Sequence, residues 1–545
     1  MTDDLDHWRT MALAVLQKAG RAGPQHAPED VDRLLATTTD NGTTIAPLHL
    51  AGPPAPALGT PPTPGGWDVR PHHDATDPDL GEALAADIAA GVTSVWLESP
   101  EPAVLRAILP TLRAAGTAIV LEAGERNAEA AEALLTQPEP VRGNLGADPI
   151  GLAVRQGGTP DLAMLAALAG RCANRPGLRS IVVDGTAFHD VGGGEADELG
   201  SALATGVAYL RALTEGGLPV QAAFEQIEFR YAVGADQFVE IAKLRAARLL
   251  WARVGAVCGV APARQWQHAV TSRAMMTARA PWNNLVRTTV AAFAAVAGGA
   301  DALTVRPFDA CLGRSGAQAQ RLTRTTQAIL RLEAQAARVH DPAAGSWYAE
   351  RLTRDLAAAG WDWFQKLESN GGPVASLADG MLTERLAATA EQRRQQVRQL
   401  SRTIVGVNRY VALDEERPRS AAAPAGHRHA ADFERVRDRA EAAGSPKIPL
   451  VLLDSATASS DAGLAGQVLA AGGLTGVPGW PAGPAPVALL CGTGSVGDEA
   501  IRSAVDRLRA IGVRRIRTFA DGPFRQGQDV VAGLDGLLDD LGAAQ

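Results

Sequence analysis

Short apolar segments and longer amphipathic stretches alternate along the chain from about Trp67 to Tyr410. The apolar segments have the length of strands and include VTSVWLE, GTAIVLE, LRSIVVD and DALTVRPFD. Strands that alternate with helices pair in parallel, because each helix carries the chain back to the start of the next strand. At roughly 340 residues, this region fits a (β/α)8 barrel with insertions better than an open sheet.

A second, smaller α/β region is predicted near the C-terminus. Residues 448–453 form an apolar run with the length of a strand buried on both faces, and residues 461–469 can be helical. Further strands are expected at VALLCG and RRIRTF. The proline- and alanine-rich stretch RPRSAAAPAGHRHAADFERVRDRAEAAG precedes this region and predicts a linker that leads into a charged helix.

The N-terminus is predicted to be an arm outside the main domain. It contains the helical pattern HWRTMALAVLQKAG, and the proline- and glycine-rich LAGPPAPALGTPPTPGGW follows as extended chain, because proline fixes φ and cannot donate to a ladder. Exposing Trp8, Leu13, Val15 and Leu16 costs roughly 25 cal/mol per Å² of apolar surface, so the helix should pack on another surface. The predicted parts are a helical arm (1–35), a barrel (36–415), a linker (416–446) and a second α/β domain (447–545).

Charge and cysteine content argue against several classes of protein. The formal net charge of −8 comes from 60 acidic and 52 basic residues without a long block of either sign, so a nucleic-acid or anionic membrane surface is not expected. The four cysteines lie far apart, which predicts neither a disulfide framework nor a zinc knuckle. The acidic start MTDDLDHWRT and the lack of about 18 consecutive apolar residues argue against a signal peptide and a membrane span. We therefore expect a soluble, cytoplasmic protein.

The segment FVEIAKLRAARLLWARV is expected to be an amphipathic helix. Five apolar residues recur at the spacing of a packing stripe: Phe238, Ile241, Ala242, Ala246 and Leu249. Three basic residues are predicted to form a solvated or salt-bridged face: Lys243, Arg245 and Arg248.

Several strings carry a resemblance to a known enzyme family. They are FVEIAKLRAARLLWARV, TSRAMMTARAPWNNLVRTTVAAFAAVAGGADALTVRPFDACLG, DPAAGSWYAERLT and IVGVNRY. They resemble the adenosylcobalamin-dependent acyl-CoA mutases, above all methylmalonyl-CoA mutase, most densely between residues 230 and 410. The resemblance implies a TIM barrel with the acyl-CoA along its axis, followed by a flavodoxin-like doubly wound domain that carries the corrinoid. An axial ligand requires small, polar residues in the bore, because barrel interiors are normally packed.

The family's cobalt-binding motif is degenerate in this chain. In active members a D-x-H-x-x-G motif provides the histidine that ligates cobalt and the carboxylate that orients this histidine. Here Ser460 replaces the histidine and Ala458 replaces the carboxylate, while Asp461 and Gly463 are retained. Asp454 replaces a lysine. A serine hydroxyl is a poor ligand for cobalt, so the resemblance implies a degenerate cobalamin site, with no cofactor-binding or metal-ligating residue on this chain.

Two substrate-contacting positions of the family's barrel are also altered. The family's R-Q-Y-A-G segment resembles RPHHD, which keeps Arg70 but has His72 in place of the tyrosine beside the acyl group. The segment G-T-I-Q-N-D resembles GNLGAD, which has Gly146 in place of a glutamine. Both changes remove side chains that contact the substrate in the family.

A third barrel motif keeps its histidine but loses the neighbours. H-x-Q-T-S-G resembles HAVTSR, in which Val270 replaces the glutamine and Arg273 replaces the glycine, where it could intrude into the bore. His268 corresponds to the family's histidine over the thioester carbonyl. Such a histidine can polarise the carbonyl by hydrogen bonding. Without its partners a structural role is expected, so the resemblance implies no catalytic residue on this chain.

The combined losses resemble the small subunit of heterodimeric bacterial methylmalonyl-CoA mutases. This implies a non-catalytic partner of a large subunit that binds adenosylcobalamin and the acyl-CoA. The complex, an isomerase of propionate metabolism, interconverts (R)-methylmalonyl-CoA and succinyl-CoA. In related heterodimers the N-terminal arm of one subunit wraps the other, and residues 1–35 are expected to do the same. Two alternatives stay open: an independently active mutase with unconventional cobalamin binding, and a stand-alone barrel for another acyl-CoA.

Two local patterns could suggest other sites. His72 and His73 beside Asp74 could bind a metal, but adjacent strand residues point to opposite faces, so surface or loop roles are favoured. The glycine-rich LLCGTGSVGDEA resembles a nucleotide loop only weakly. Because Asp498 and Glu499 follow, a helix N-terminus capped by its own carboxylates is the favoured interpretation.

Overall fold

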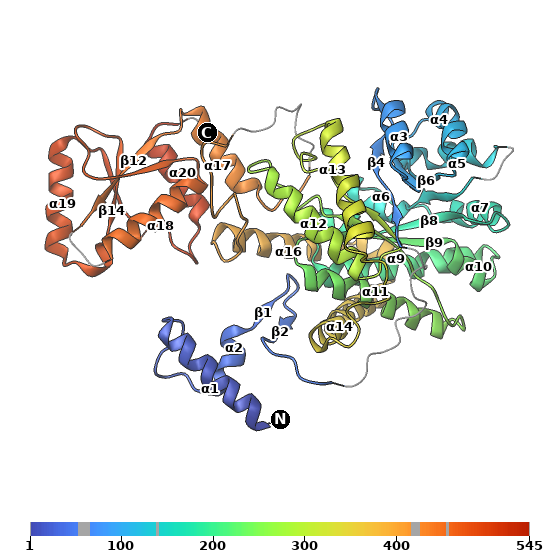
Figure 1. Cartoon of the computed structure of the whole chain (residues 1–545), viewed down its shortest axis with the longest axis horizontal. Helices are drawn as coiled ribbons and strands as arrows, with labels where there is room; N and C mark the ends of the chain where they lie inside the picture. The colour runs from blue at the N-terminus through green and yellow to red at the C-terminus, as the bar shows by residue number, and fades with distance from the viewer. Residues whose placement is uncertain are drawn as a thin grey trace. The chain divides into compact units, whose positions relative to one another are not determined.

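The computed structural model describes residues 2–52, 66–137, 141–415, 426–453, 457–520 and 522–543 (Figure 1). Contacts along the backbone divide the chain into two compact units. The first comprises Met1–Thr271, Val290–Val305 and Arg324–Thr389, and the second comprises Ser272–Thr289, Arg306–Thr323 and Ala390–Gln545. The domain limits that the sequence predicts at residues 35, 415 and 446 remain predictions.

The first unit contains a sheet in which nine described strands all pair in parallel, in the order β3-β11-β10-β9-β8-β7-β6-β5-β4. The strands are β3 (Asp68–Val69), β4 (His72–Asp74), β5 (Ser94–Glu98), β6 (Ala118–Glu122), β7 (Gly143–Ala147), β8 (Leu178–Asp184), β9 (Ile227–Val233), β10 (Trp266–Thr271) and β11 (Ala302–Thr304). Apart from β3 and β4, neighbours in the sheet follow one another along the chain, as repeated strand–helix units require.

One short segment of chain joins the two ends of this sheet. Only Arg70 and Pro71 separate β3 from β4, yet β3 pairs with β11 and β4 pairs with β5. The Arg70 N–H donates to the Leu303 carbonyl at 3.0 Å, and the Trp96 N–H donates to the Pro71 carbonyl at 2.9 Å. If β3 and β4 are counted as one interrupted strand, the sheet has the eight strands of a closed barrel. The predicted TIM barrel is confirmed.

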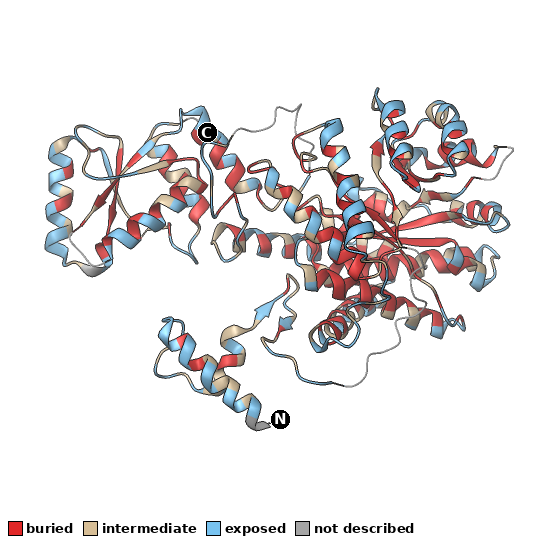
Figure 2. Ribbon diagram, viewed as in Figure 1, coloured by how far each residue is buried: buried red, intermediate tan, exposed pale blue. Residues whose placement is uncertain are grey.

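Helices follow the strands along the chain (Figure 1). They are α3 (Leu80–Ala89), α4 (Pro102–Ala114), α5 (Asn127–Leu135), α6 (Pro149–Gln156), α7 (Ala163–Cys172), α8 (Thr186–Asp190), α9 (Glu195–Glu215), α10 (Val220–Glu225), α11 (Gln237–Val257), α12 (Trp282–Ala297), α13 (Ala317–Ala328), α14 (Trp347–Ser369), α15 (Gly372–Ala378) and α16 (Met381–Arg398). β9 is buried along its whole length, and the barrel strands are largely red in Figure 2. Strands buried on both faces explain the continuous apolar runs. None of the described helices is long and apolar enough to cross a membrane.

Three basic residues of α11, Lys243, Arg245 and Arg248, are buried, not solvated. Lys243 is 1% exposed, and its Nζ lies 2.7 Å from Glu198 and 2.8 Å from Glu240. Arg245 is likewise buried and pairs with two carboxylates. The expected salt bridges are therefore confirmed for these residues, but the expected solvent exposure is wrong. Phe238, which the helical stripe placed in the core, is 50% exposed.

The second unit contains a four-stranded parallel sheet in the order β13-β12-β14-β15. Its strands are β12 (Lys447–Leu452), β13 (Thr475–Pro478), β14 (Val487–Cys491) and β15 (Arg515–Thr518), and its helices are α17 (Ala431–Ala442), α18 (Ala458–Ala471), α19 (Asp498–Ile511) and α20 (Val530–Asp540). Taken in chain order the strands lie 2-1-3-4, which is the doubly wound order of flavodoxin-like domains. The second α/β domain is therefore confirmed.

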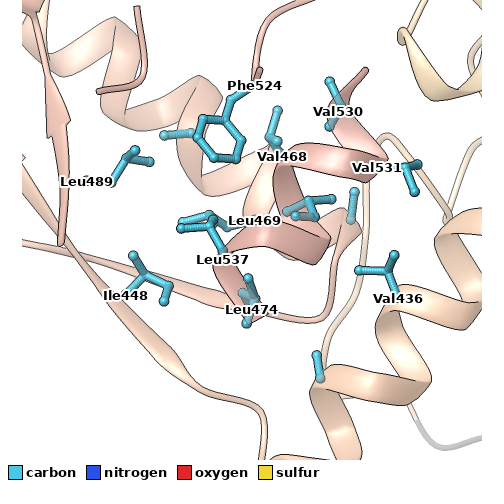
Figure 3. Close-up of a cluster of buried hydrophobic side chains, with 14 of the residues drawn as sticks. Val436, Ile448, Val468, Leu469, Leu474, Leu489, Phe524, Val530, Val531 and Leu537 are labelled. Atoms are coloured by element: carbon cyan, nitrogen blue, oxygen red, sulfur yellow. The ribbon is translucent and has the colours of Figure 1, made fainter. Parts of the chain in front are cut away.

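The core of this second domain forms where helices cover the sheet (Figure 3). Ile448 of β12 and Leu489 of β14 lie near Leu469 of α18 and Leu537 of α20, and Phe524 comes from the segment between β15 and α20. All five are at most 1% exposed. Burying one such side chain fully contributes about 1.5–3 kcal/mol, so this cluster stabilises the sheet.

The N-terminal arm folds partly on itself. α1 (Thr2–Lys18) contacts a short 3-10 turn (Pro28–Asp30) and α2 (Val31–Leu35), which leaves Leu13 and Leu16 buried. Met11 and Val15 stay exposed, at 59% and 67%. The apolar side chains of α1 are thus only partly buried within this chain. The proline-rich residues 53–65, expected to be extended, lie outside the described residues.

Candidate functional site

The bore of the barrel is filled by side chains from four strands. Trp96 of β5, Val120 of β6, Val182 of β8 and Val270 of β10 form one buried cluster. Residues two apart along a strand face the same side, so these positions share the inner face with the residues two before and two after them. A packed layer of this kind is the usual interior of a closed barrel.

Arg230 of β9 adds a charged layer beside this apolar one. Its Nη1 donates to Glu122 and to Asp184, both at 2.8 Å, and its guanidinium carbon lies 3.9 Å from the centre of the Trp96 ring. Arg155 also pairs with Asp184, at 2.5 Å. Burial raises the pKa of Asp184, but the two guanidinium groups outweigh this effect and hold the pKa below its ordinary value. The ion pairs therefore stay charged at neutral pH and tie three strands and a helix together.

His268 of β10 is held at both ring nitrogens. The Thr304 hydroxyl donates to the Arg70 carbonyl at 2.5 Å, so it has no proton to give to the histidine. The Nε2–H of His268 therefore donates to Thr304 Oγ1 at 2.7 Å, and Nδ1 accepts from Arg230 Nε at 3.3 Å. The edge of the ring also faces Trp96, with centroids 5.5 Å apart. This arrangement engages both nitrogens within the protein, as expected of a structural histidine.

Arg70 forms a second group of charged contacts in the bore, with Asp68, Ser94 and Glu228. Its guanidinium pairs with Glu228, donates to Asp68 at 2.9 Å and donates to Ser94 at 2.9 Å. Burial lowers the pKa of Arg70, but the two carboxylates outweigh it and raise the pKa. The arginine that the sequence shares with the family is thus a cross-strand tie between β3/β4, β5 and β9 in this chain.

A pocket of about 700 Å³ opens at the carboxyl ends of strands β5 to β9. This is where barrel enzymes place their active sites. Six carboxylates line it, against three guanidinium groups: Glu98, Glu122, Glu125, Asp148, Asp161 and Asp184, against Arg126, Arg155 and Arg230. Two of the three arginines are already paired within the bore. The lining therefore disfavours an anionic ligand.

Asp148 is the carboxylate in this pocket with the most unusual environment. Burial and the nearby Asp184 raise its pKa to about 6, although the Tyr209 hydroxyl donates to it at 2.6 Å. Asp148 also accepts from the Gly151 N–H at the start of α6. Its position is explained by capping this helix.

Gly146 of β7 has a backbone that excludes a side chain. Its φ is +70°, and an added Cβ would lie 1.8 Å from the Leu121 carbonyl oxygen. The Asn144 side chain accepts from the Gly146 N–H at 2.9 Å, within an irregularity in the pairing of β7 with β8. The position of the family's substrate-contacting glutamine is thus occupied by backbone packed against the neighbouring strand.

The adjacent histidines point to opposite sides, as predicted. His72 lies 4.3 Å from Trp96, ring to ring, and its Nε2 lies 2.9 Å from Glu98. His73 is buried on the other face, where its Nε2 lies 2.6 Å from Asp87. Within the described ranges, no group of three or more His, Cys, Asp or Glu side chains could hold a metal ion.

Arg273, just after β10, belongs to the second unit. Its Cδ lies 3.8 Å from the position that a Cβ on Gly426 would take. The side chain therefore lies beside the segment that leads into α17. The expected intrusion of Arg273 into the bore stays a prediction.

In the second domain, the loop that resembles the corrinoid cradle binds its own neighbours. Ser460 lies in the first turn of α18, where its hydroxyl donates to the Thr457 carbonyl at 3.0 Å. Asp461 is buried and accepts from the Gly492 N–H at 3.0 Å and from Arg525 at 3.4 Å. Ala458 is buried, and Asp454 lies outside the described residues. These groups do not fit a cobalamin held through a lower histidine, because none of them offers an imidazole.

The loop after β14 carries no sign of a nucleotide site. α19 begins at Asp498, and Gly497 precedes it as the capping residue, without a side-chain bond to the free N–H groups. Asp498 and Glu499 lie in the first turn, where negative charge complements the helix dipole. The expected negative charge at the start of this helix is present. The capping residue, however, is Gly497, so the helix has no side-chain cap.

Sequence reasoning missed the residues that dominate the bore. Arg230, Glu122, Asp184 and Trp96 all stand at inward positions of strands that read as apolar runs. The available signal was a charged residue inside such a run, as in IEFRYAV, since a buried charge requires a partner.

Comparisons with known proteins identify the family of this chain. A sequence model of the methylmalonyl-CoA mutase family matches residues 132–456. The methylmalonyl-CoA mutase small subunit of Streptomyces virginiae is 40% identical over 99% of this chain and 97% of that protein. The small subunit of Propionibacterium freudenreichii subsp. shermanii is 32% identical over 88% and 83%, and the large subunit of Streptomyces virginiae is 35% identical over 44% and 33%. This chain therefore belongs to the methylmalonyl-CoA mutase family.

Proposed function

We propose that this chain is the non-catalytic small subunit of a heterodimeric methylmalonyl-CoA mutase. The cytoplasmic complex interconverts methylmalonyl-CoA and succinyl-CoA, and the large subunit binds the acyl-CoA and adenosylcobalamin. The observation that carries the proposal is the filled bore, in which Arg230 bridges Glu122, Asp184 and Trp96. A substrate threaded along the axis has to displace this layer.

Displacing the layer is energetically unfavourable. Arg230 is 1% exposed, and separating it from its carboxylates leaves buried charges without partners, which typically costs about 3–5 kcal/mol. The open pocket beyond the layer has more carboxylates than guanidinium groups. Acyl-CoA esters carry phosphates, and methylmalonyl-CoA has a further carboxylate, so the pocket repels the very groups that it would need to bind.

The loop at Ser460 supports assigning the cofactor to the partner. Cobalt binding by a histidine depends on an unprotonated imidazole and a carboxylate that orients it. The corresponding side chains here are a hydroxyl that bonds its own helix and a methyl group. We accordingly assign no cofactor contact to this domain.

The partner is inferred from the relatives and from the arm. The similar proteins over nearly the full length are named small subunits, and a large subunit is similar over part of the chain. Met11 and Val15 on α1 are the exposed apolar side chains with which the arm would contact the large subunit. In this proposal the chain contributes stability and interface.

The proposed function is tested by reconstitution. The chain, a catalytic large-subunit homologue and their mixture are assayed for methylmalonyl-CoA turnover with adenosylcobalamin, and association is followed by analytical ultracentrifugation. We expect the chain alone to give no turnover and to retain no cofactor in equilibrium dialysis at low micromolar concentration. The mixture is expected to form a 1:1 complex with more activity than the large subunit alone.

Each other outcome identifies a different protein. Turnover by the isolated chain would make it an independent mutase with unconventional cobalamin binding. Binding of an acyl-CoA without association with the large subunit would instead indicate a stand-alone acyl-CoA-binding barrel.

Removing the retained histidine should leave the activity of the complex nearly unchanged. We expect His268→Ala to alter turnover less than about threefold, whereas a catalytic hydrogen-bond donor contributes on the order of 100-fold or more. Steady-state turnover of the assembled complex is the measurement, with His268→Gln as a control that keeps a polar group near Arg230 and Thr304. A tenfold loss in both variants, with assembly intact, would return a catalytic role to this barrel.

A further inference from the structure

A small hairpin follows the N-terminal arm and docks on the barrel of its own chain. Strands β1 (Thr37–Thr38) and β2 (Thr44–Ile45) pair antiparallel, and the turn between them is closed by hydrogen bonds between Thr39 and Thr43. Gly42 has a φ of +79°, the left-handed conformation that glycine adopts readily in a tight hairpin loop. The tip of the hairpin is therefore a defined structure that can carry a specific contact.

That contact is made by Asn41 at the N-terminus of α9. Its Oδ1 accepts from the Ala196 N–H at 2.9 Å, and its Nδ2 donates to Asp197 at 2.7 Å. An added Cβ on Gly194 would lie 2.4 Å from Asn41 Oδ1, so the tip fits against the glycine. Asp197 is fully buried and is also bonded by Arg385. Asn41 thus acts as a cap supplied from another part of the chain.

The same docked tip adds a negative charge near the start of α9. The carboxylate of Asp40, next to Asn41, raises the pKa of Glu195, whose Oε2 is buried and has no hydrogen-bond partner among the described residues. The other charged groups that face Glu195 are Glu240 and Lys243 of α11. Lys243 is already engaged by both Glu198 and Glu240. A charge on Glu195 is therefore poorly compensated while the hairpin is docked.

We propose that the hairpin is a pH-sensitive clasp, which holds the root of the N-terminal arm on its own barrel when Glu195 is protonated and loosens when Glu195 is ionised. When the hairpin is released, the arm can reach the large subunit more freely. This consequence for assembly rests on the function proposed above. The clasp itself is a property of the isolated chain.

The direction of the pH effect follows from the docked environment. Burial, Asp40 and Glu240 raise the pKa of Glu195 to about 7, and opening the clasp removes Asp40 and admits water, so that the pKa falls toward its ordinary 4.5. The docked state then binds the proton more tightly, and docking is strongest at low pH and weakens until the pH passes about 7. Between pH 6 and pH 8, the opening constant should rise by up to about tenfold.

Hydrogen exchange in the full-length chain tests this proposal without the partner. Exchange of the Ala196 and Asp197 amides and of the 37–45 hairpin is measured at pH 6 and pH 8 and divided by the intrinsic chemical rate at each pH. We expect the corrected opening to increase several-fold to tenfold in the wild type and to stay constant in Glu195→Gln. Asp40→Asn should show a smaller change, and Asn41→Ala should exchange rapidly at both pH values.

Two results would overturn the clasp. One is a corrected opening in the wild type that does not depend on pH, and the other is the same pH dependence in Glu195→Gln. Because Glu195→Gln preserves the size of the side chain, the test remains decisive if Asn41→Ala folds poorly. A negative result in hydrogen exchange would not change the result of reconstitution with the large subunit. A negative result in reconstitution would likewise not change the exchange data, so the two proposals are tested separately.

Discussion

The Gly146→Gln variant, which restores the residue type of the family's catalytic barrels, is expected to lose about 3 kcal/mol or more of unfolding free energy and to gain no activity. A side chain in the left-handed region costs about 1–3 kcal/mol. The new Cβ would also lie 1.8 Å from the Leu121 carbonyl oxygen, and such overpacking typically costs a further 1–3 kcal/mol or so. Urea denaturation followed by circular dichroism gives the difference.

A matched control separates the two causes. Gly157 has a φ of +82°, but nothing lies within 4 Å of the Cβ position, so Gly157→Gln should cost only the backbone term of about 1–3 kcal/mol. Equal losses in the two variants would show that β6 and β7 readily make room for a side chain. In that case the glutamine could return to this site, and the barrel would be closer to a substrate-binding one than we propose.

The Arg230→Met variant should be destabilised by about 3–5 kcal/mol at neutral pH, because it leaves the buried Asp184 and the partly buried Glu122 with Arg155 as their remaining arginine partner. Methionine keeps much of the volume beside Trp96, so the loss reports mainly on charge. Arg126→Met is the control: its exposed guanidinium pairs with exposed Glu101, and the change should stay within about 0.5–1 kcal/mol.

The same variant should show a changed dependence on pH. The depressed pKa of Asp184 in the wild type contributes stability above the ordinary pKa of an aspartate, and this contribution is lost as the pH falls. Without Arg230 much of the contribution is missing, so the difference in unfolding free energy between wild type and variant should keep its full size from pH 7 to about pH 4 and shrink as the pH falls from about 4 toward 2. A difference that stays constant over this lower range would mean that the network stabilises by packing and not by charge.

The sequence predicted well those features that depend on local patterns. Apolar runs such as LRSIVVD and IPLVLL appear as β8 and β12, within a residue or two of the expected limits. The opposite orientation of His72 and His73 also followed, since alternation along a strand is a local rule.

Features that depend on distant pairing were not predictable in this way. Arg230 and Glu122 are separated by 108 residues, and nothing near either residue indicates the other. Similarly, α11 has charged residues on all sides, and its burial depends on α9 and α14, which supply carboxylates. The distribution of apolar residues around this one helix could therefore not predict that Lys243 is buried and Phe238 is exposed. The family resemblance identified the substrate-contacting positions that differ in this chain. It could not predict that side chains from other strands fill the bore of the barrel.

The closing seam of the barrel has a consequence for synthesis on the ribosome. The first strand is split into β3 and β4, and its β3 half finds its neighbour only at β11, as in the bond from Thr304 to Arg70 across 234 residues. At about 5–20 residues per second, translating that interval takes roughly 12–47 seconds. Throughout this time β4 can pair with β5, but the edge of β3 has no strand to bind. The nascent chain thus carries an open sheet edge while these 234 residues are made, and a chaperone that covers such an edge would act on this protein before its last barrel strand emerges.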